Sequence, residues 1–146
     1  MADAMNLPVR IVIDDPVPGV RIMLQRGATA RADLLPPAAS SPRELAFDFE
    51  LRVEGALGDG RPRLLGSFVQ GPPGARFVYL CVGKAAGQFT SEWSRRVKMP
   101  LGGISWDLLR ALPPGGRIAA HIASRGRDGS PSCATVPLLD PGWRIV

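Results

Sequence analysis

Residues 44–54 constrain the fold more strongly than any other part of the chain. Apolar side chains occupy every second position, at Leu45, Phe47, Phe49, Leu51 and Val53. The positions between them are charged, apart from Ala46. Successive side chains of a strand point to opposite faces, whereas a helix would spread these five residues around its circumference. The segment therefore predicts a long strand with one buried and one solvated face.

Shorter apolar runs elsewhere in the chain indicate further strands. Glycine and proline number 17 and 15 among the 146 residues, which is well above average usage and favours many turns. We predict one hairpin from 8–14 and 20–26, and a second from 64–70 and 76–82. Pro73 and Gly74, in the loop of the second hairpin, are the residue pair of a type II turn. Other strands are expected at 95–99, 117–124, 133–138 and 143–146.

One short helix is predicted near 104–112. Ser105 is a suitable N-cap, Asp107 favours the first turn, and the apolar residues form one stripe. Few helices and many short strands are typical of an antiparallel β-sandwich or an open barrel. The sequence thus predicts a mainly β fold of seven to eight strands with one short helix, in a single β domain spanning 1–146.

The basic charge is scattered rather than concentrated. The formal net charge is +5, but the densest basic clusters, at 61–63, 95–98 and 125–127, are short. Between Trp93 and Lys98 an aromatic side chain alternates with cations, a pairing that single-stranded nucleic-acid proteins use for stacking and phosphate contact. We favour an exposed edge strand whose charge prevents edge-to-edge pairing. Nucleic acid is therefore not the expected partner.

The cysteines and the N-terminal residues indicate a reducing compartment. Cys81 and Cys133 both lie in apolar stretches, where lone cysteines act as small hydrophobic residues; their redox state stays open. The first residues lack the features of an export signal, and no apolar run reaches the roughly 18 residues of a membrane span. We expect a soluble cytoplasmic protein without a membrane partner.

Catalytic chemistry would depend on His121, the one histidine in the sequence. A small hydrolase or isomerase is conceivable if an acid such as Asp107 or Asp128 assists it. We favour a structural role for His121, and an enzyme is the less favoured reading. One histidine and two separated cysteines lack any metal-ligand spacing, so no metal or cofactor is expected.

The acidic residues of segment 44–54 could be read as a catalytic carboxyl pair, but a solvated strand face also explains them. Asp48 and Glu50 lie about 6.8 Å apart along a strand, within the carboxyl spacing of inverting glycosidases. Any alternating acidic strand gives this spacing. We expect instead a solvated face paired with cross-strand arginines such as Arg10 or Arg21.

The best candidate ligand-binding residues are an arginine, amphipathic aromatics and the histidine. Such side chains supply the few polar points of an otherwise apolar pocket. They are Arg76, Tyr79, Trp93, Trp106 and His121. Nothing in the sequence brings the five together.

Four segments resemble a bacterial family of small uncharacterised proteins. They are residues 10–16 with 20–27, residues 68–79, residues 126–136 and residues 142–144. The resemblance extends over nearly the whole chain. It is to a domain of unknown function, so it implies no activity, cofactor or site.

These features favour a non-enzymatic binding module for a small molecule or a protein. Two alternatives remain: a hydrolase or isomerase that uses His121, and a single-stranded nucleic-acid protein that binds through Trp93 to Lys98. The open edges of such a sheet are also compatible with a homodimer.

Overall fold

The alternating segment forms a strand, β5 (Glu44–Gly55), as the sequence predicts. The computed structural model describes residues 3–16, 20–27, 33–55, 61–84, 93–123 and 142–146. Within β5 the alternating apolar side chains are buried, whereas Asp48, Glu50 and Arg52 are exposed. The long strand therefore has the one dry face and the one wet face that its period of two indicates.

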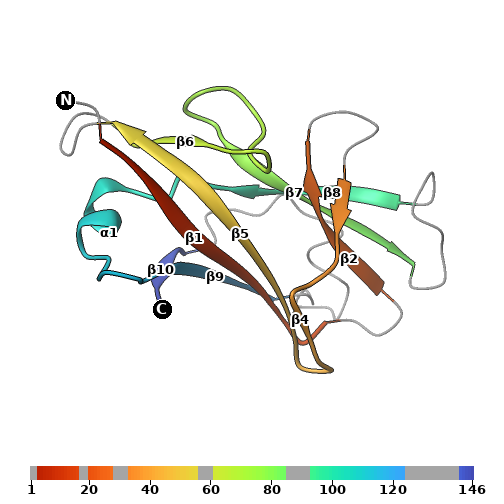
Figure 1. The fold of residues 1–146 in the computed structure, drawn as a ribbon. Coiled ribbons are helices and arrows are strands. Elements are labelled where there is room, and N and C mark those ends of the chain that lie inside the picture. The colour runs from red at the N-terminus through yellow and green to blue at the C-terminus, as the bar shows by residue number, and fades with distance from the viewer. Residues whose placement is uncertain (1–2, 17–19, 28–32, 56–60, 85–92, 124–141) are drawn as a thin grey trace.

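β5 belongs to the larger of two sheets, here called sheet A. Its other strands are β1 (Asp3–Asp14), β4 (Ala39–Ser40), β6 (Arg63–Leu65), β9 (Ile118–Ala123) and β10 (Arg144–Ile145). The order is β10-β9-β1-β5-β4, and β6 also pairs with β5. β1 and β5 pair antiparallel along their whole lengths (Figure 1).

The second sheet, sheet B, has the order β3-β2-β7-β8, and its neighbouring strands are antiparallel. Its strands are β2 (Val20–Arg26), β3 (Asp33–Leu35), β7 (Phe77–Lys84) and β8 (Trp93–Pro100). Val9 and Phe47 of sheet A belong to the same buried cluster as Ile22 and Leu80 of sheet B. The two sheets therefore enclose one core, and the prediction of a mainly β, largely antiparallel fold with one short helix is confirmed.

Both predicted hairpins are wrong in their pairing. β1 pairs with β5 and β9, whereas β2 pairs with β3 and β7 in the other sheet. β6 pairs with β5, and only a single bridge between Gln70 and Phe77 links segment 64–70 to β7. Alternation fixes which side chains face the core, but the same alternation suits two strands on opposite sides of that core.

The strand count and one strand direction also differ from prediction. Ten strands are described instead of seven to eight, and the two that the sequence did not predict, β3 and β4, are only three and two residues long. β1 and β9 pair in parallel, unlike the other ladders. The long connection between them makes this possible, since parallel neighbours need a crossover rather than a tight turn. The predicted strand 133–138 and Cys133 lie outside the described residues.

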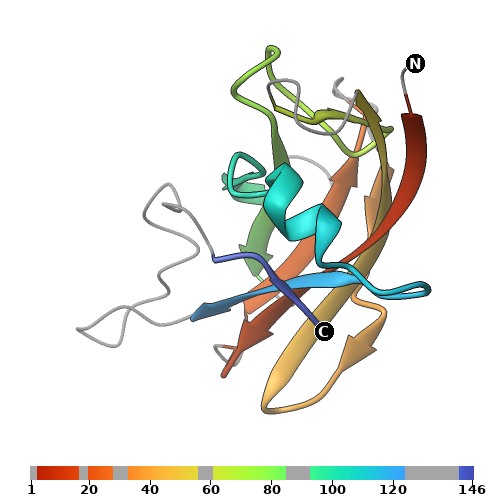
Figure 2. The same ribbon diagram turned by 90° about the vertical axis from the view of Figure 1, so that its left-hand side faces the viewer.

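The helix α1 (Trp106–Arg110) lies within the predicted range. The Ser105 hydroxyl accepts a hydrogen bond from the Leu108 N–H at 3.2 Å, so Ser105 is the N-cap. Trp106 and Leu109 are buried in the shared core. Figure 2 shows α1 across one end of the two sheets, where the chain passes from β8 of sheet B to β9 of sheet A.

Within the described ranges, no helix combines the length and apolarity that crossing a lipid bilayer requires. Cys81 is buried, and its thiol donates to Oε1 of Gln25 at 3.5 Å. Its role as a small buried side chain agrees with the apolar stretch in which it lies.

Candidate functional site

A cavity of about 230 Å³ lies where three segments meet near α1. Residues 61–64 include the start of β6, residues 73–76 precede β7, and residues 101–104 follow β8. In the β7–β8 ladder Phe77 is opposite Pro100, and the Leu101 N–H donates to the Arg76 carbonyl at 3.0 Å. These bonds hold the second and third segments side by side.

The first segment reaches the cavity through sheet A. β6 pairs with the end of β5, so that Leu64 is opposite Val53 and Arg63 is opposite Glu54. Successive residues of a strand face opposite sides, and Leu64 is the buried one while Arg63 is exposed. The cavity thus forms only when both sheets are assembled.

A tight turn shapes one wall. Pro73 and Gly74 line the cavity. Gly74 has φ of +87°, and the Ala75 N–H donates to the Pro72 carbonyl at 3.0 Å. A type II turn needs a positive φ at its third residue, which glycine adopts without strain. The predicted Pro73–Gly74 turn is therefore confirmed.

The inner wall is apolar and the rim is cationic. Leu64, Leu101 and Ile104 are buried, and the guanidinium-bearing residues Arg61, Arg63 and Arg76 complete the lining with Pro62, Pro73, Gly74 and Gly102. A mostly apolar hollow with a few convergent polar groups is typical of a small-molecule site.

No carboxylate is among the residues that line this cavity. The Arg76 guanidinium donates to the Gly71 carbonyl, which orients the side chain without neutralising it. Within the described ranges none of the three arginines is in an ion pair. Glu54, opposite Arg63 in the ladder, accepts a hydrogen bond from Arg52 at 2.8 Å. The positive charge of the rim is therefore largely uncompensated.

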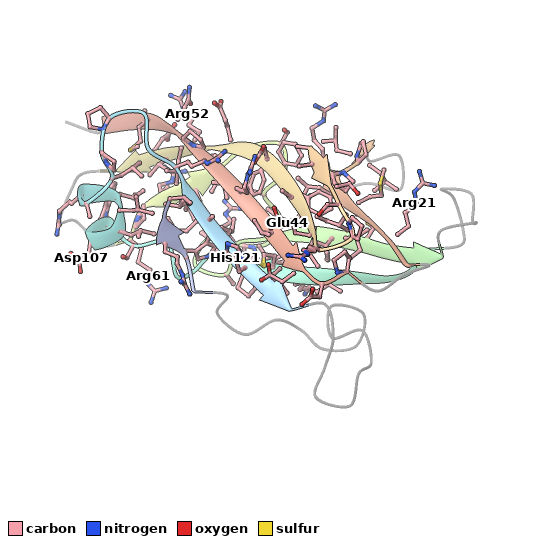
Figure 3. All side chains as sticks on the ribbon, turned by 90° about the horizontal axis from the view of Figure 1, so that it is seen from below. Arg21, Glu44, Arg52, Arg61, Asp107 and His121 are labelled. Atoms are coloured by element: carbon pink, nitrogen blue, oxygen red, sulfur yellow. The ribbon has the colours of Figure 1, made fainter. Side chains whose placement is uncertain are left out.

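A second, more open hollow of about 350 Å³ adjoins the cavity. The two share Arg61, Pro62, Gly102 and Ile104, and the second adds the N-cap Ser105 together with Trp106, Asp107 and Arg110 from α1. Asp107 and Arg110 neutralise each other at 2.9 Å. Figure 3 shows Arg61 and Asp107 at the same end of the molecule, opposite the end that carries Arg21.

Two of the five predicted ligand-binding residues lie at these hollows. Arg76 lines the cavity and Trp106 lines the adjoining hollow. Tyr79 packs edge-on against Phe77, with ring centroids 4.9 Å apart, on β7. Trp93 begins β8, and its side chain lies outside the described part. The structure therefore does not gather the five into one site.

His121 lies on the outer face of sheet A, away from both sets of lining residues. Its Nδ1 is 3.2 Å from Oδ2 of Asp14, and both side chains are about half exposed. The acid beside His121 is therefore Asp14, whereas Asp107 pairs with Arg110 and Asp128 lies outside the described residues. In the described part of the chain, His121 has no hydrogen-bond partner other than Asp14.

A second ion pair on the same outer face, between Arg10 and Asp48, shifts the pKa values of both side chains. Arg10 Nε and Nη2 donate to the two carboxylate oxygens of Asp48 at 2.7 and 2.8 Å. This hydrogen bonding holds the pKa of Asp48 below its usual value and raises that of Arg10. The predicted pairing of the acidic face with Arg10 is confirmed, whereas Arg21 lies on β2 in the other sheet.

Sequence reasoning missed Arg61 and Arg63 as site residues. These two residues form one of the short basic clusters, but nothing in the local sequence distinguishes this cluster from those at 95–98 and 125–127. No group of three or more metal-ligating side chains occurs among the residues that the structure describes.

The fold and the cavity together define a two-sheet β protein with an arginine-rimmed hollow of ligand size. The chain belongs to the Family of unknown function (DUF5990), whose family model matches residues 7–146. The expected membership of a domain of unknown function is therefore confirmed. Comparison with curated proteins gave no match, and comparison with solved structures gave none either.

Proposed function

We propose that this protein is a non-enzymatic binding module that holds a small molecule in the arginine-rimmed cavity. The observation that carries the proposal is the combination of an apolar wall with three arginines that come from two separate segments. Burial of an organic ligand against the accessible apolar lining, chiefly Pro62 and Pro73, supplies a hydrophobic contribution of about 25 cal/mol per Å² of apolar surface. The rim then selects and orients the ligand.

The cavity is also built on rigid supports, which favours binding. Two of its walls are strand ends joined by the Leu101–Arg76 hydrogen bond, and the third is β6 paired to β5. A preformed site avoids the cost of ordering loops when the ligand binds.

Gly102 offers a direct test. It lines both hollows, and a Cβ at this position would meet only Arg61 Nη1, at 4.0 Å. The variant Gly102→Phe should therefore fold and fill the hollow. The probes are benzamide, benzoate and phenyl phosphate, each titrated to ~10 mM to detect weak binding, with the methyl NMR signals of Leu64, Leu101 and Ile104 as the readout.

The proposal expects at least one probe to shift these methyl signals in the native protein. Gly102→Phe should abolish that shift. Gly103→Phe is the matched control, because Gly103 is exposed and lines neither hollow, and it should leave binding unchanged. If none of the three probes perturbs the cavity methyl groups, or if Gly102→Phe binds as the native protein does, the proposed site is wrong.

One observation favours an alternative. Asp14 approaches Nδ1 of His121, an arrangement that orients an imidazole for acid–base chemistry and leaves Nε2 for a substrate. Neither hollow is lined by His121, however. The hydrolase or isomerase hypothesis thus has a positioned base but no described pocket beside it, and binding in the cavity remains the better-supported function.

A further inference from the structure

We infer that the ligand of this cavity is a small phosphate monoester, recognised by Arg61, Arg63 and Arg76. This inference rests on the proposed binding function and specifies the ligand class. It starts from the charge of the lining residues, which include Arg61, Arg63 and Arg76 and no aspartate or glutamate. Arg76 is half-buried, and half-buried charge without a counter-ion is costly, so a bound anion would relieve that cost, while the exposed Arg61 and Arg63 would add attraction from the solvent side.

The residues that surround the cavity leave this charge in place. Arg110 of the adjoining hollow is neutralised by Asp107, and the Glu54 carboxylate accepts a hydrogen bond from Arg52. Arg76 is half-buried and is held by a main-chain carbonyl that carries no net charge. A guanidinium has five N–H donors, so donors remain for a ligand after that hydrogen bond.

The number of arginines favours a phosphate over a carboxylate. One guanidinium fork already satisfies both oxygens of a carboxylate, which has a single negative charge. A phosphate monoester has a charge of about −1.5 to −2 at neutral pH and three strong acceptor oxygens. Three arginines from two segments of the chain match that charge and that set of acceptors more closely.

The apolar wall favours an ester over inorganic phosphate. Pro62 and Pro73 are accessible apolar lining residues, and behind them lie the buried side chains of Leu64, Leu101 and Ile104. Inorganic phosphate would leave the apolar surface of Pro62 and Pro73 uncovered. An organic group attached to the phosphate would cover it and would displace water from the guanidinium groups, which strengthens the electrostatic attraction.

The test compares four probes in the full-length protein by isothermal titration calorimetry at low salt. They are phenyl phosphate, inorganic phosphate, benzoate and benzamide. We expect phenyl phosphate to bind about tenfold more tightly than benzoate, because the phosphate has a charge of about −1.5 to −2 and a third acceptor oxygen, and so makes more charge-assisted bonds than the singly charged carboxylate. Inorganic phosphate and benzamide should each bind more weakly than phenyl phosphate.

Two exposed arginines provide the variants. Arg61→Gln and Arg63→Gln should each raise the Kd for phenyl phosphate by about fivefold or more and should weaken benzamide binding much less, since the lost charge attracts only the anion. Arg43→Gln is the matched control, because Arg43 is also exposed and does not line the hollow. It should change the Kd by less than about twofold, which is the size of a distant screened charge effect.

The outcomes separate this inference from the proposed function. If benzamide or benzoate binds in the cavity as tightly as phenyl phosphate, the phosphate class is wrong and the binding module stands. Equal weakening by Arg43→Gln and Arg63→Gln would indicate a general effect of net charge and would also overturn the inference. If inorganic phosphate binds as tightly as phenyl phosphate, the ligand is free phosphate and the inference of a monoester is wrong. If no probe binds, the proposed function itself fails.

Discussion

Two buried tryptophans differ in a single hydrogen bond. Trp106 and Trp143 are each 8% exposed and belong to the core. The Trp143 Nε1–H donates to the Pro100 carbonyl at 3.2 Å. The buried Trp106 Nε1–H has no acceptor in the described part of the protein. A buried donor without a partner is costly, so removing it should be less harmful than removing a donor that is bonded.

The same substitution at both positions measures this difference. Trp143→Phe and Trp106→Phe leave comparable cavities, but only Trp143→Phe leaves a carbonyl without its donor. We expect Trp143→Phe to lower the free energy of unfolding by about 1 kcal/mol more than Trp106→Phe. Urea denaturation of both variants checks this. Equal losses would mean that Trp106 Nε1 has an acceptor as good as the Pro100 carbonyl.

At the scale of elements, the β1–β5 ladder combines a buried face with an ion pair on its solvated face. Arg10 and Asp48 are directly opposite in the antiparallel register. Their bidentate geometry is favourable, but the side chains are 27% and 40% exposed. Water screens a pair of this kind, so its contribution to stability is on the order of 0.2–1 kcal/mol.

The pH dependence of this contribution has a definite sign. Because Arg10 lowers the pKa of Asp48 in the folded protein, the pair stabilises the fold above the unfolded aspartate pKa of about 4. The contribution is lost as the pH falls through the lower, folded pKa. We expect Asp48→Asn to be less stable than the native protein at neutral pH, with a difference that shrinks toward zero in acid.

Urea denaturation between about pH 2 and pH 7 measures that difference across the relevant window. Glu50→Gln is the control, because Glu50 is exposed on the same face of β5. It should leave the acid dependence as in the native protein. A stability difference for Asp48→Asn that stays constant through this window would contradict the assigned linkage.

At the scale of the molecule, the last residues connect the two sheets. β10 pairs with β9 in sheet A, whereas Trp143 donates to the carbonyl of Pro100 at the end of β8 in sheet B. The Val146 N–H also donates to the Arg117 carbonyl at 2.9 Å. This segment therefore links sheet A to sheet B near the end of the molecule where α1 lies.

Truncation of the tryptophan tests that role. Trp143→Ala should lower the free energy of unfolding by about 3–5 kcal/mol, since it removes a large buried side chain and its hydrogen bond. Val146→Ala serves as the control, because Val146 is 65% exposed, and it should change stability by less than about 0.5 kcal/mol. If both variants lose a similar amount of the free energy of unfolding, Trp143 does not link the two sheets as inferred.

The sequence alone determined the properties that depend on neighbouring residues. The period of two in β5, the Ser105 cap of α1, the Pro73–Gly74 turn and the solvated face with Arg10 are all local, and each was predicted correctly. Local steric preference and the alternation of side chains suffice for such features.

Only the tertiary structure decided which strands pair and which side chains share a site. β1 and β2 alternate equally well whether they are neighbours or face each other across the core, so pairing depends on the packing of the whole chain. Arg63 and Arg76 meet at one cavity because β6 joins sheet A while β7 joins sheet B. No local sequence pattern predicts that these two arginines line one cavity, since this arrangement arises from contacts between segments that are distant in the sequence.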